Sequence, residues 1–384
     1  MREKLTWSQA IKKVLRDAGG PLDYQEIADR IMSQELVSTT GKTPERTVNT
    51  ELNKTMRGEV KRVDKGVYEL LSHDVAQGVA LENVPQIDIE LDFQLPEYTK
   101  ASASELWVSE DWLKRFWILL KSKKQVILTG PPGTGKTFLA RGLSDKLADV
   151  ESQVKFIQFH PSYGYEDFFE GYRPSGQTRS GISLQLQRGP LREIADLAEQ
   201  NPERPYFLII DEINRGNLSR IFGECYFLLE YRNQSVRLMY SGDQFSLPEN
   251  LFIIGTMNSA DRSIALVDTA IRRRFAFVEL HPSTEPTQSL LEKWCEKEGI
   301  QVPLMELWSE LNRRISMHGG HRESLIGPAY FMDSSVTSKE WMSVMWETEI
   351  LPLLDEIFID KHSWVREKFS FNTIAHMVRA EFPA

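Results

Sequence analysis

The sequence predicts an α/β fold: a parallel sheet flanked by helices, followed by an all-α domain and preceded by a small helix-turn-helix domain with a β-hairpin wing. Three observations predict it. Short apolar runs alternate with helical patterns through the middle of the 384-residue chain, which is typical of a parallel sheet. The pattern is only helical beyond residue 281, and residues 1–72 combine three amphipathic helices with a hairpin pattern. We therefore expect domains at 1–72, 109–281 and 282–384, with a linker at 73–108.

Composition and charge exclude several classes of protein. Apolar residues make up 41% of the chain and charged residues 26%, as in a globular protein. Neither a signal peptide nor an apolar run of about 18 residues, the length that spans a bilayer, is evident. We expect a cytoplasmic protein without membrane contact, in which Cys225 and Cys295 are buried thiols. The net charge of −9 argues against a uniformly basic nucleic-acid binder, but residues 1–72 hold 13 Lys and Arg against 11 Asp and Glu. Any contact with nucleic acid is therefore expected at this end.

The first 72 residues have the pattern of a winged helix-turn-helix. Capping residues and a 3.6-residue apolar period predict helices over residues 6–18, from Asp23, and from Pro44 with Thr43 as its cap. Residues 60–70 then alternate like a hairpin that turns at 64–66. In such a module the third helix enters the major groove of DNA and the hairpin contacts the backbone. The apolar positions expected to face inward in the second and third helices are Ile27, Ile31, Met32, Val48, Leu52 and Met56.

These residues resemble the HARE-HTH family of winged helices, which is associated with DNA-linked proteins including restriction systems. The resemblance lies in Trp7, the Gly20-Pro21-Leu22 turn, residues 41–44 and Gly66-Val67-Tyr68. It implies candidate groove or phosphate contacts at Arg46, Asn49, Lys54 and Arg57, and candidate wing contacts at Lys61, Arg62 and Lys65. The alternative is a winged helix used for protein contacts, because the third helix and its end also carry Glu45, Glu51 and Glu59.

The linker prediction for residues 73–108 depends on a change in composition. Asp88 to Asp92 is acidic, Pro85 and Pro96 interrupt the stretch, and residues 101–104 are small and polar. One short extended piece is expected at 86–93. A helix capped by Ser109 then leads into the next domain.

A phosphate-binding loop follows a buried strand expected at Val126–Leu128. The loop has the complete G-x-x-x-x-G-K-T pattern, in which glycines let successive backbone N–H groups point at an anion and the following helix adds its positive end. Lys136 is expected to reach the β- and γ-phosphates, and the Thr137 hydroxyl to bind Mg²⁺. The pattern therefore predicts binding of a nucleoside triphosphate by Gly130, Pro131, Pro132, Gly133, Thr134, Gly135, Lys136 and Thr137.

The rest of the sheet domain is predicted from apolar runs and turn signals. An aromatic-rich loop is expected at 160–174 and a hairpin at 236–247. Further strands are expected at 154–159, 205–210, 251–255 and 275–280, and helices at 190–200 and 218–231.

Polar residues with distinct chemistry follow these strands. Asp211 and Glu212 end the third strand, at the edge where open α/β sheets bind ligands. Asp211 is expected to hold Mg²⁺ through water, and Glu212 to polarise the attacking water. Asn258 ends the next strand, where its amide could hold that water by a donor and an acceptor; the alternative is an Asx-turn.

The arginine run 272–274 lies at the end of the helix before the last strand. Phosphoryl transfer gains roughly 10³–10⁵ in rate from a guanidinium supplied by a neighbouring subunit. The alternative is a solvated basic helix end that complements the helix dipole.

Together, residues 130–137, 211–217, 257–263 and 270–275 resemble the McrB branch of the AAA+ ATPases, the motor subunits of modification-dependent restriction systems. The aromatic stretch 158–174 and residues 326–331 also match, and Ser259 stands where the family usually has Thr. The resemblance implies hexameric rings, Mg²⁺, GTP as the favoured nucleotide and a McrC-like nuclease partner. It also implies that Arg215 and either Arg272 or Arg273 act on a neighbour's nucleotide. ATP stays open, because the phosphate loop does not contact the base.

We therefore predict an AAA+ ring motor, driven by GTP or ATP, that couples recognition of double-stranded DNA, modified or unmodified, to cleavage by a partner nuclease in antiviral defence. Two alternatives stay open. The chain could be a DNA-bound regulator switched by nucleotide, or an AAA+ remodeller that acts on protein.

Overall fold

The structure is a computed structural model of the chain. The residues it describes are 6–18, 22–34, 36–37, 44–54, 60–64, 66–70, 100–178, 181–260, 269–333, 335, 338–359, 361–380 and 382. They divide into two compact units, Met1–Asp74 and Val75–Ala384. Thr43, Met56, Arg57, Lys65 and the extended piece expected at 86–93 lie outside the described residues.

The N-terminal unit is the predicted winged helix-turn-helix. Its helices are α1 (Trp7–Ala18), α2 (Tyr24–Ser33) and α3 (Pro44–Lys54), and its sheet has the antiparallel order β1 (Leu22–Asp23), β3 (Val67–Leu70), β2 (Val60–Asp64). The expected caps are present, since the Thr6 hydroxyl accepts from the Gln9 N–H and the Asp23 carboxylate accepts from the Gln25 N–H. The prediction for Met32 was wrong: it is 41% exposed, because α2 turns Ala28 toward the core beside Ile27 and Ile31.

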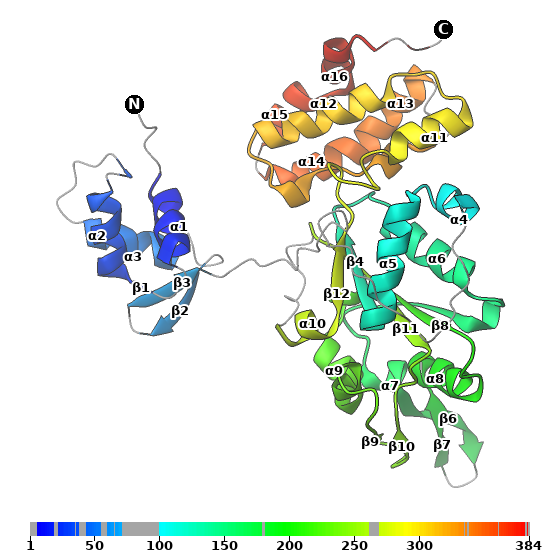
Figure 1. Cartoon of the computed structure of the whole chain (residues 1–384). Helices are drawn as coiled ribbons and strands as arrows, with labels where there is room; N and C mark the ends of the chain where they lie inside the picture. Colours follow the sequence, from blue (N-terminus) through cyan, green and yellow to red (C-terminus); the bar gives the residue numbers. More distant parts are fainter. Residues whose placement is uncertain are drawn as a thin grey trace. The chain divides into compact units, whose positions relative to one another are not determined.

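The second unit contains a five-stranded parallel sheet, as the alternating pattern predicted (Figure 1). Its order is β12 (Ala276–Glu279), β4 (Gln125–Gly130), β11 (Leu251–Asn258), β8 (Tyr206–Asp211), β5 (Val154–Gln158). Neighbouring residues of one strand point to opposite faces, so Phe207 and Ile209 belong to one core cluster, and Leu208 and Ile210 to the other. Both faces are therefore buried, which explains the continuous apolar strands.

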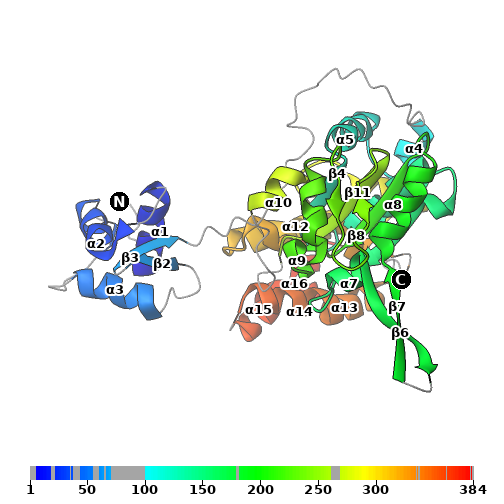
Figure 2. The same cartoon turned by 90° about the horizontal axis from the view of Figure 1, so that it is seen from below.

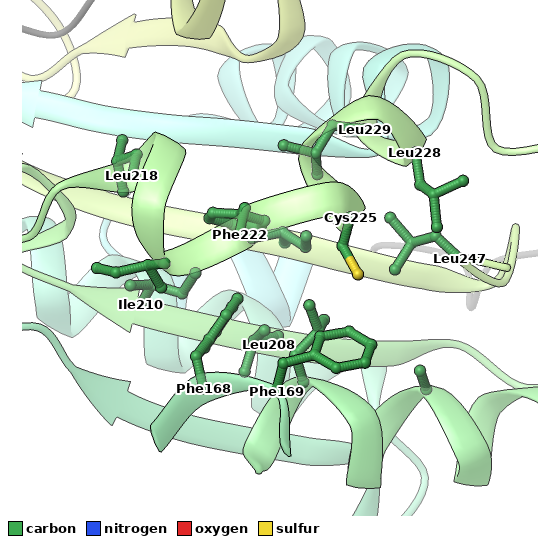
Figure 3. Close-up of a cluster of buried hydrophobic side chains, with 14 of the residues drawn as sticks. Phe168, Phe169, Leu208, Ile210, Leu218, Phe222, Cys225, Leu228, Leu229 and Leu247 are labelled. Atoms are coloured by element: carbon green, nitrogen blue, oxygen red, sulfur yellow. The ribbon is translucent and has the colours of Figure 1, made fainter. Parts of the chain in front are cut away.

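Helices cover each face of this sheet. Helices α5 (Glu110–Lys123) and α6 (Lys136–Leu147) bury apolar residues in one cluster, and α8 (Pro190–Gln200) and α9 (Leu218–Phe222) in the other. Figure 3 shows the second cluster, in which Phe168, Phe222 and Cys225 pack over Leu208 and Ile210. Cys225 is buried and Cys295 is partly buried, and both are free thiols. Burial raises the pKa of each, so both thiols are protonated at neutral pH.

Three segments of this unit differ from the sequence predictions. The stretch predicted as linker already contains α4 (Lys100–Glu105), because Ala103, Leu106 and Val108 are buried in the sheet core. The helix predicted over 218–231 ends at Phe222, because Gly223 has φ +51°, and a 3₁₀ helix, η4 (Gly223–Leu229), follows it. The hairpin expected at 236–247 is confirmed, but its strands β9 (Val236–Arg237) and β10 (Gln244–Phe245) are short.

The aromatic-rich segment is not a loop. It forms α7 (Tyr165–Phe168) and then a long hairpin of β6 (Glu170–Thr178) and β7 (Gly181–Arg188), which projects from the body of the unit (Figure 2). The aromatic side chains are explained by packing, since Tyr165, Phe168 and Phe169 are buried in the core below the hairpin.

The residues after the sheet form the predicted all-α lid. Its helices pack around one buried cluster centred on Trp346, and they lie as a separate bundle beside the sheet (Figure 1). They are α11 (Leu290–Glu298), α12 (Leu304–Met317), α13 (Lys339–Met345), α14 (Leu351–Ile357), α15 (His362–Phe369) and α16 (Phe371–Val378). Among the described residues, no helix is long and apolar enough to cross a membrane.

Candidate nucleotide site

The phosphate loop connects the end of β4 to the start of α6, as the pattern predicts. Gly133 and Gly135 have φ of +74° and +82°, values that side chains disfavour, and α6 begins directly at Lys136. Gly130 is required for a different reason: a Cβ there would lie 2.0 Å from the backbone oxygen of Leu280, at the end of the neighbouring strand β12. The strand order of the sheet thus fixes where the loop begins.

The Lys136 ammonium lies over the loop. Its Nζ donates to the backbone oxygens of Gly130 and Pro131 at 3.0 and 2.7 Å, and the buried Thr134 hydroxyl also donates to the Pro131 oxygen. A positive charge is therefore held at the place where the pattern expects phosphates.

The two predicted metal ligands are brought together across 74 residues of sequence. The Thr137 hydroxyl donates to Asp211 Oδ1 at 2.7 Å, because α6 starts beside the carboxyl end of β8. Neighbouring ligands of an octahedral Mg²⁺ with bonds of about 2.1 Å lie about 3 Å apart. This pair of oxygens therefore fits the ion in spacing and in chemistry, and Thr137 and Asp211 are the residues that would hold it.

Thr256 completes this arrangement, and it was missed in the sequence. Its hydroxyl donates to Asp211 Oδ1 at 2.6 Å and accepts from the Glu212 N–H at 3.2 Å. It lies two residues before Asn258 in β11 and so on the same face of the sheet. That period-two relation to Asn258 was the available signal, but Thr in a strand is so common that it indicates no function alone.

Glu212 sits in an unusual backbone conformation directly after β8. Its φ and ψ are 52° and 45°, in the left-handed region that a non-glycine residue enters at an energetic cost. Its Oε2 accepts from Arg215 Nε at 3.2 Å, and 24% of its side chain is exposed. Such strain at the end of a central strand is typical of a functional position.

Asn258 lies beside the first residue of the phosphate loop, since β11 pairs it with Gly130. The Gly130 oxygen also accepts from the Ser259 N–H at 3.0 Å. Asn258 Oδ1 accepts from the Ala260 N–H at 3.1 Å, so the Asx-turn alternative is confirmed. This turn fixes the amide at the sheet edge, and a role toward water stays a prediction.

The three arginines of the run, at the end of α10 (Thr269–Arg274), differ in their surroundings. Arg274 is committed to its own chain: it pairs with Glu230 at 2.9 Å and lies over the Tyr226 ring at 4.4 Å. Arg273 is exposed, whereas Arg272 is half-buried. Arg215 is 43% exposed and contacts Glu212. The structure therefore separates Arg274, which holds the fold, from the two arginines predicted to act on a neighbour.

Two titratable groups join this edge of the sheet to the lid. Burial lowers the pKa of His281, so the ring is neutral at pH 7, and its Nε2 contacts the Arg322 backbone oxygen at 3.1 Å. The Arg322 guanidinium donates to Glu279 at 2.7 Å, but burial still raises the pKa of Glu279. The start of the lid is thus tied to the end of β12.

The predicted DNA-contact residues lie on α3 and the wing of the N-terminal unit. Arg46 is exposed on α3, whereas Asn49 Oδ1 accepts from the Tyr68 hydroxyl at 3.5 Å and so connects α3 to β3. Lys54 ends α3, and Lys61 and Arg62 belong to β2.

Three known protein families match separate parts of this chain. Residues 5–70 match the HARE-HTH domain, a restriction endonuclease HTH domain, residues 125–275 the AAA domain of the dynein-related subfamily, and residues 303–366 the α-helical lid domain of McrB. The three matches follow the order of the winged helix, the sheet and the lid.

Individual relatives agree with these matches. The chain is 40% identical over 278 residues to the Type IV methyl-directed restriction enzyme EcoKMcrB subunit of Escherichia coli (strain K12), across 67% of this chain and 59% of that protein. It is 25% identical over 312 residues to the Type II restriction enzyme BsuMI component YdiS of Bacillus subtilis (strain 168), across 69% of this chain and 88% of that protein. Neuron navigator 2 of Homo sapiens is 26% identical over 267 residues, which make up 64% of this chain and 9% of that protein.

Proposed function

The chain is a McrB-like AAA+ protein with an N-terminal HARE-HTH domain, and from this premise we propose that it is a Mg²⁺-dependent ring motor that hydrolyses GTP, or alternatively ATP, to drive restriction of DNA by a partner nuclease. The observation that carries the proposal is the contact between Thr137 and Asp211 at 2.7 Å, with Glu212 next in sequence. It joins the phosphate loop to the acidic strand end in the arrangement that phosphoryl transfer needs.

Each residue of the site has a separate task in hydrolysis. The backbone N–H groups of the loop and the Lys136 ammonium neutralise the β- and γ-phosphates. Thr137 and Asp211 hold Mg²⁺, which neutralises charge that develops on the phosphate oxygens. Glu212 accepts a proton from the attacking water, and Asn258 orients that water. The left-handed backbone of Glu212 turns its side chain away from the direction of β8.

A neighbouring copy supplies the remaining positive charge in this proposal. Arg273 is exposed and Arg272 is half-buried at the end of α10, and neither is the arginine that pairs with Glu230. A guanidinium from a second subunit stabilises the transition state by roughly 10³–10⁵ in rate. We therefore place Arg272 or Arg273, together with Arg215, at the interface of a hexameric ring.

The winged helix and a partner complete the proposed system. Similarity to restriction proteins of Escherichia coli and Bacillus subtilis supports a role in restriction. The HARE-HTH domain supports recognition of double-stranded DNA, modified or unmodified, through basic residues of α3 and the wing. We propose that cleavage is carried out by a separate McrC-like nuclease subunit.

Turnover of purified protein tests the proposal. We expect Mg²⁺-dependent release of phosphate from GTP or ATP. Glu212→Gln should bind nucleotide as tightly as the wild type but lose turnover, and Lys136→Ala should lose binding. Wild-type turnover in Glu212→Gln would refute the role of this residue. Turnover without any DNA cleavage, in the presence of a McrC-like subunit and duplex DNA with and without methylation, would favour a nucleotide-switched regulator or a protein remodeller.

A further inference from the structure

A segment of the lid lies directly on the phosphate loop. This segment, residues 326–331, is here named the lid strap. The Gly327 N–H donates to the Pro132 oxygen, and the Ala329 N–H donates to the Gly133 oxygen, both at 2.9 Å. A Cβ on Gly327 would lie 2.1 Å from the Gly133 carbonyl carbon, so the two backbones touch without room for a side chain.

The contact continues through Tyr330. A Cβ placed on Gly133 would lie 2.7 Å from the Tyr330 ring, so the ring covers the loop where Gly133 has none. Glycines on both sides therefore permit this approach: Gly133 in the loop and Gly327 in the lid strap.

The lid strap is itself fixed by buried hydrogen bonds within the lid. The Asn312 amide, on α12, accepts from the Ile326 N–H at 2.8 Å and donates to the Ile326 oxygen at 2.9 Å. The Trp308 indole donates to the same oxygen at 2.7 Å. Asn312 is only 8% exposed, so its two bonds are shielded from water, and they orient the lid strap relative to α12.

These contacts determine which way the loop's N–H groups point. In a planar trans peptide the carbonyl and the following N–H point in opposite directions. Because the oxygens of Pro132 and Gly133 are directed at the lid strap, the N–H groups of Gly133 and Thr134 are directed to the opposite side of the loop. Inward N–H groups are what a phosphate-binding loop offers to an anion.

We propose that the lid strap holds the phosphate loop in its anion-binding conformation, with Gly327 and Asn312 as positioning residues. The inference rests on the proposed nucleotide site and adds to it a part of the lid that touches the loop from behind. Because coupling between two sites is reciprocal, bound triphosphate should in turn stabilise the lid strap against the loop.

Gly327→Ala is the most direct perturbation. Gly327 has φ −69° and ψ 163°, which alanine adopts without strain, and alanine keeps the N–H. The only new feature is a Cβ that collides with the backbone of Gly133. We expect the Kd for a fluorescent GTP or ATP analogue to rise about tenfold, equivalent to about 1.4 kcal/mol. Competition by tripolyphosphate should weaken by the same factor, because the lost contacts orient phosphate-binding groups and not a base site.

Asn312→Ala is the second variant, and Asn372→Ala, at an exposed position of α16, is its matched control. Amide hydrogen exchange at residues 327 and 329 reports directly on the lid strap. We expect faster exchange in Gly327→Ala and Asn312→Ala, slower exchange in the wild type with nucleotide, and no change in Asn372→Ala. The melting temperature of nucleotide-free Gly327→Ala should stay within about 3 °C of the wild type, whereas its nucleotide-induced rise should shrink.

Distinct outcomes separate this inference from the proposed function. Exposed amides at 327 and 329 in Gly327→Ala, with an unchanged Kd for nucleotide and tripolyphosphate, would overturn the role of the lid strap. Amides that stay equally protected in both variants would overturn it too, because the close contact would not exist. A wild type that binds no nucleotide, or Lys136→Ala binding as well as wild type, would instead refute the nucleotide site and with it the inference.

Discussion

Replacing Glu212 by glycine should make the protein more stable and inactive at the same time. Glu212 has φ +52° and ψ 45°, and the left-handed conformation costs a residue with a side chain about 1–2 kcal/mol. Glycine avoids that cost but loses about 0.5–1 kcal/mol more conformational entropy on folding than alanine. Glu212→Gly should therefore be roughly 0.5–1 kcal/mol more stable than Glu212→Ala. Both variants lose the contact with Arg215 equally, so it cancels in the comparison.

Thermal unfolding without nucleotide measures this difference. At about 2–4 °C for each kcal/mol in a domain of this class, Glu212→Gly should melt about 1–3 °C above Glu212→Ala. Phosphate release should be absent in both and in Glu212→Gln, which keeps the strain and nearly the same shape. A glycine variant that melts below the alanine variant would show that no strain is stored at Glu212. Wild-type turnover in the alanine variant would refute its assignment as the residue that polarises water.

Three further predictions concern other parts of the chain. Thr256→Val should lower kcat at least tenfold, because it removes the hydroxyl that donates to Asp211, and Thr256→Ser should retain most activity in the same phosphate-release assay. Arg274→Ala should cost about 1–2 kcal/mol and lower the melting temperature through loss of the Glu230 pair and the ring contact, whereas Arg273→Ala should abolish turnover without a change in melting temperature. For DNA, binding by the full chain should weaken and its salt dependence should flatten when the basic wing positions are neutralised together, and unchanged binding at low salt would contradict their role: Lys61, Arg62 and Lys65.

Much of the fold could be predicted because local and global signals agree in the central strands. Each buried strand is a continuous apolar run that ends in a residue with a distinct chemical role, such as Asp211 or Asn258. The spacing of the loop pattern then placed Lys136 and Thr137 at the start of a helix, as found. The same agreement holds for the caps at Asp23 and Ser109.

The missed features depend on contacts between distant residues. The β6–β7 hairpin contains Pro174, Gly176 and several polar residues, so no strand pattern stands out, and its base is fixed by the buried Arg192–Glu170 pair. The helix break at Gly223 is set by the Tyr165 ring, 2.9 Å from where a Cβ would lie.

Candidate site residues were predictable where a motif defines them and not elsewhere. Thr256 and the lid strap belong to no spacing rule, because each acts through a backbone or side-chain group far away in sequence. The lid strap was noticed in the sequence as a family match at residues 326–331, but its contact with Pro132 and Gly133 needed the folded chain. In physical terms, the strand pattern determines the sheet, whereas the packing of the lid determines what touches the loop.

The central claim is that hydrolysis occurs at a site completed by a neighbouring copy, and a mixing experiment tests it most directly. Lys136→Ala lacks productive nucleotide binding but still presents both candidate arginines, whereas the double variant Arg272→Ala/Arg273→Ala keeps its phosphate loop and presents neither. Each should be inactive alone, and a mixture should regain part of the wild-type phosphate release, because some mixed interfaces combine an intact loop with an intact arginine. If light scattering shows that mixed assemblies form and the mixture still releases no phosphate, a site shared between neighbours is contradicted.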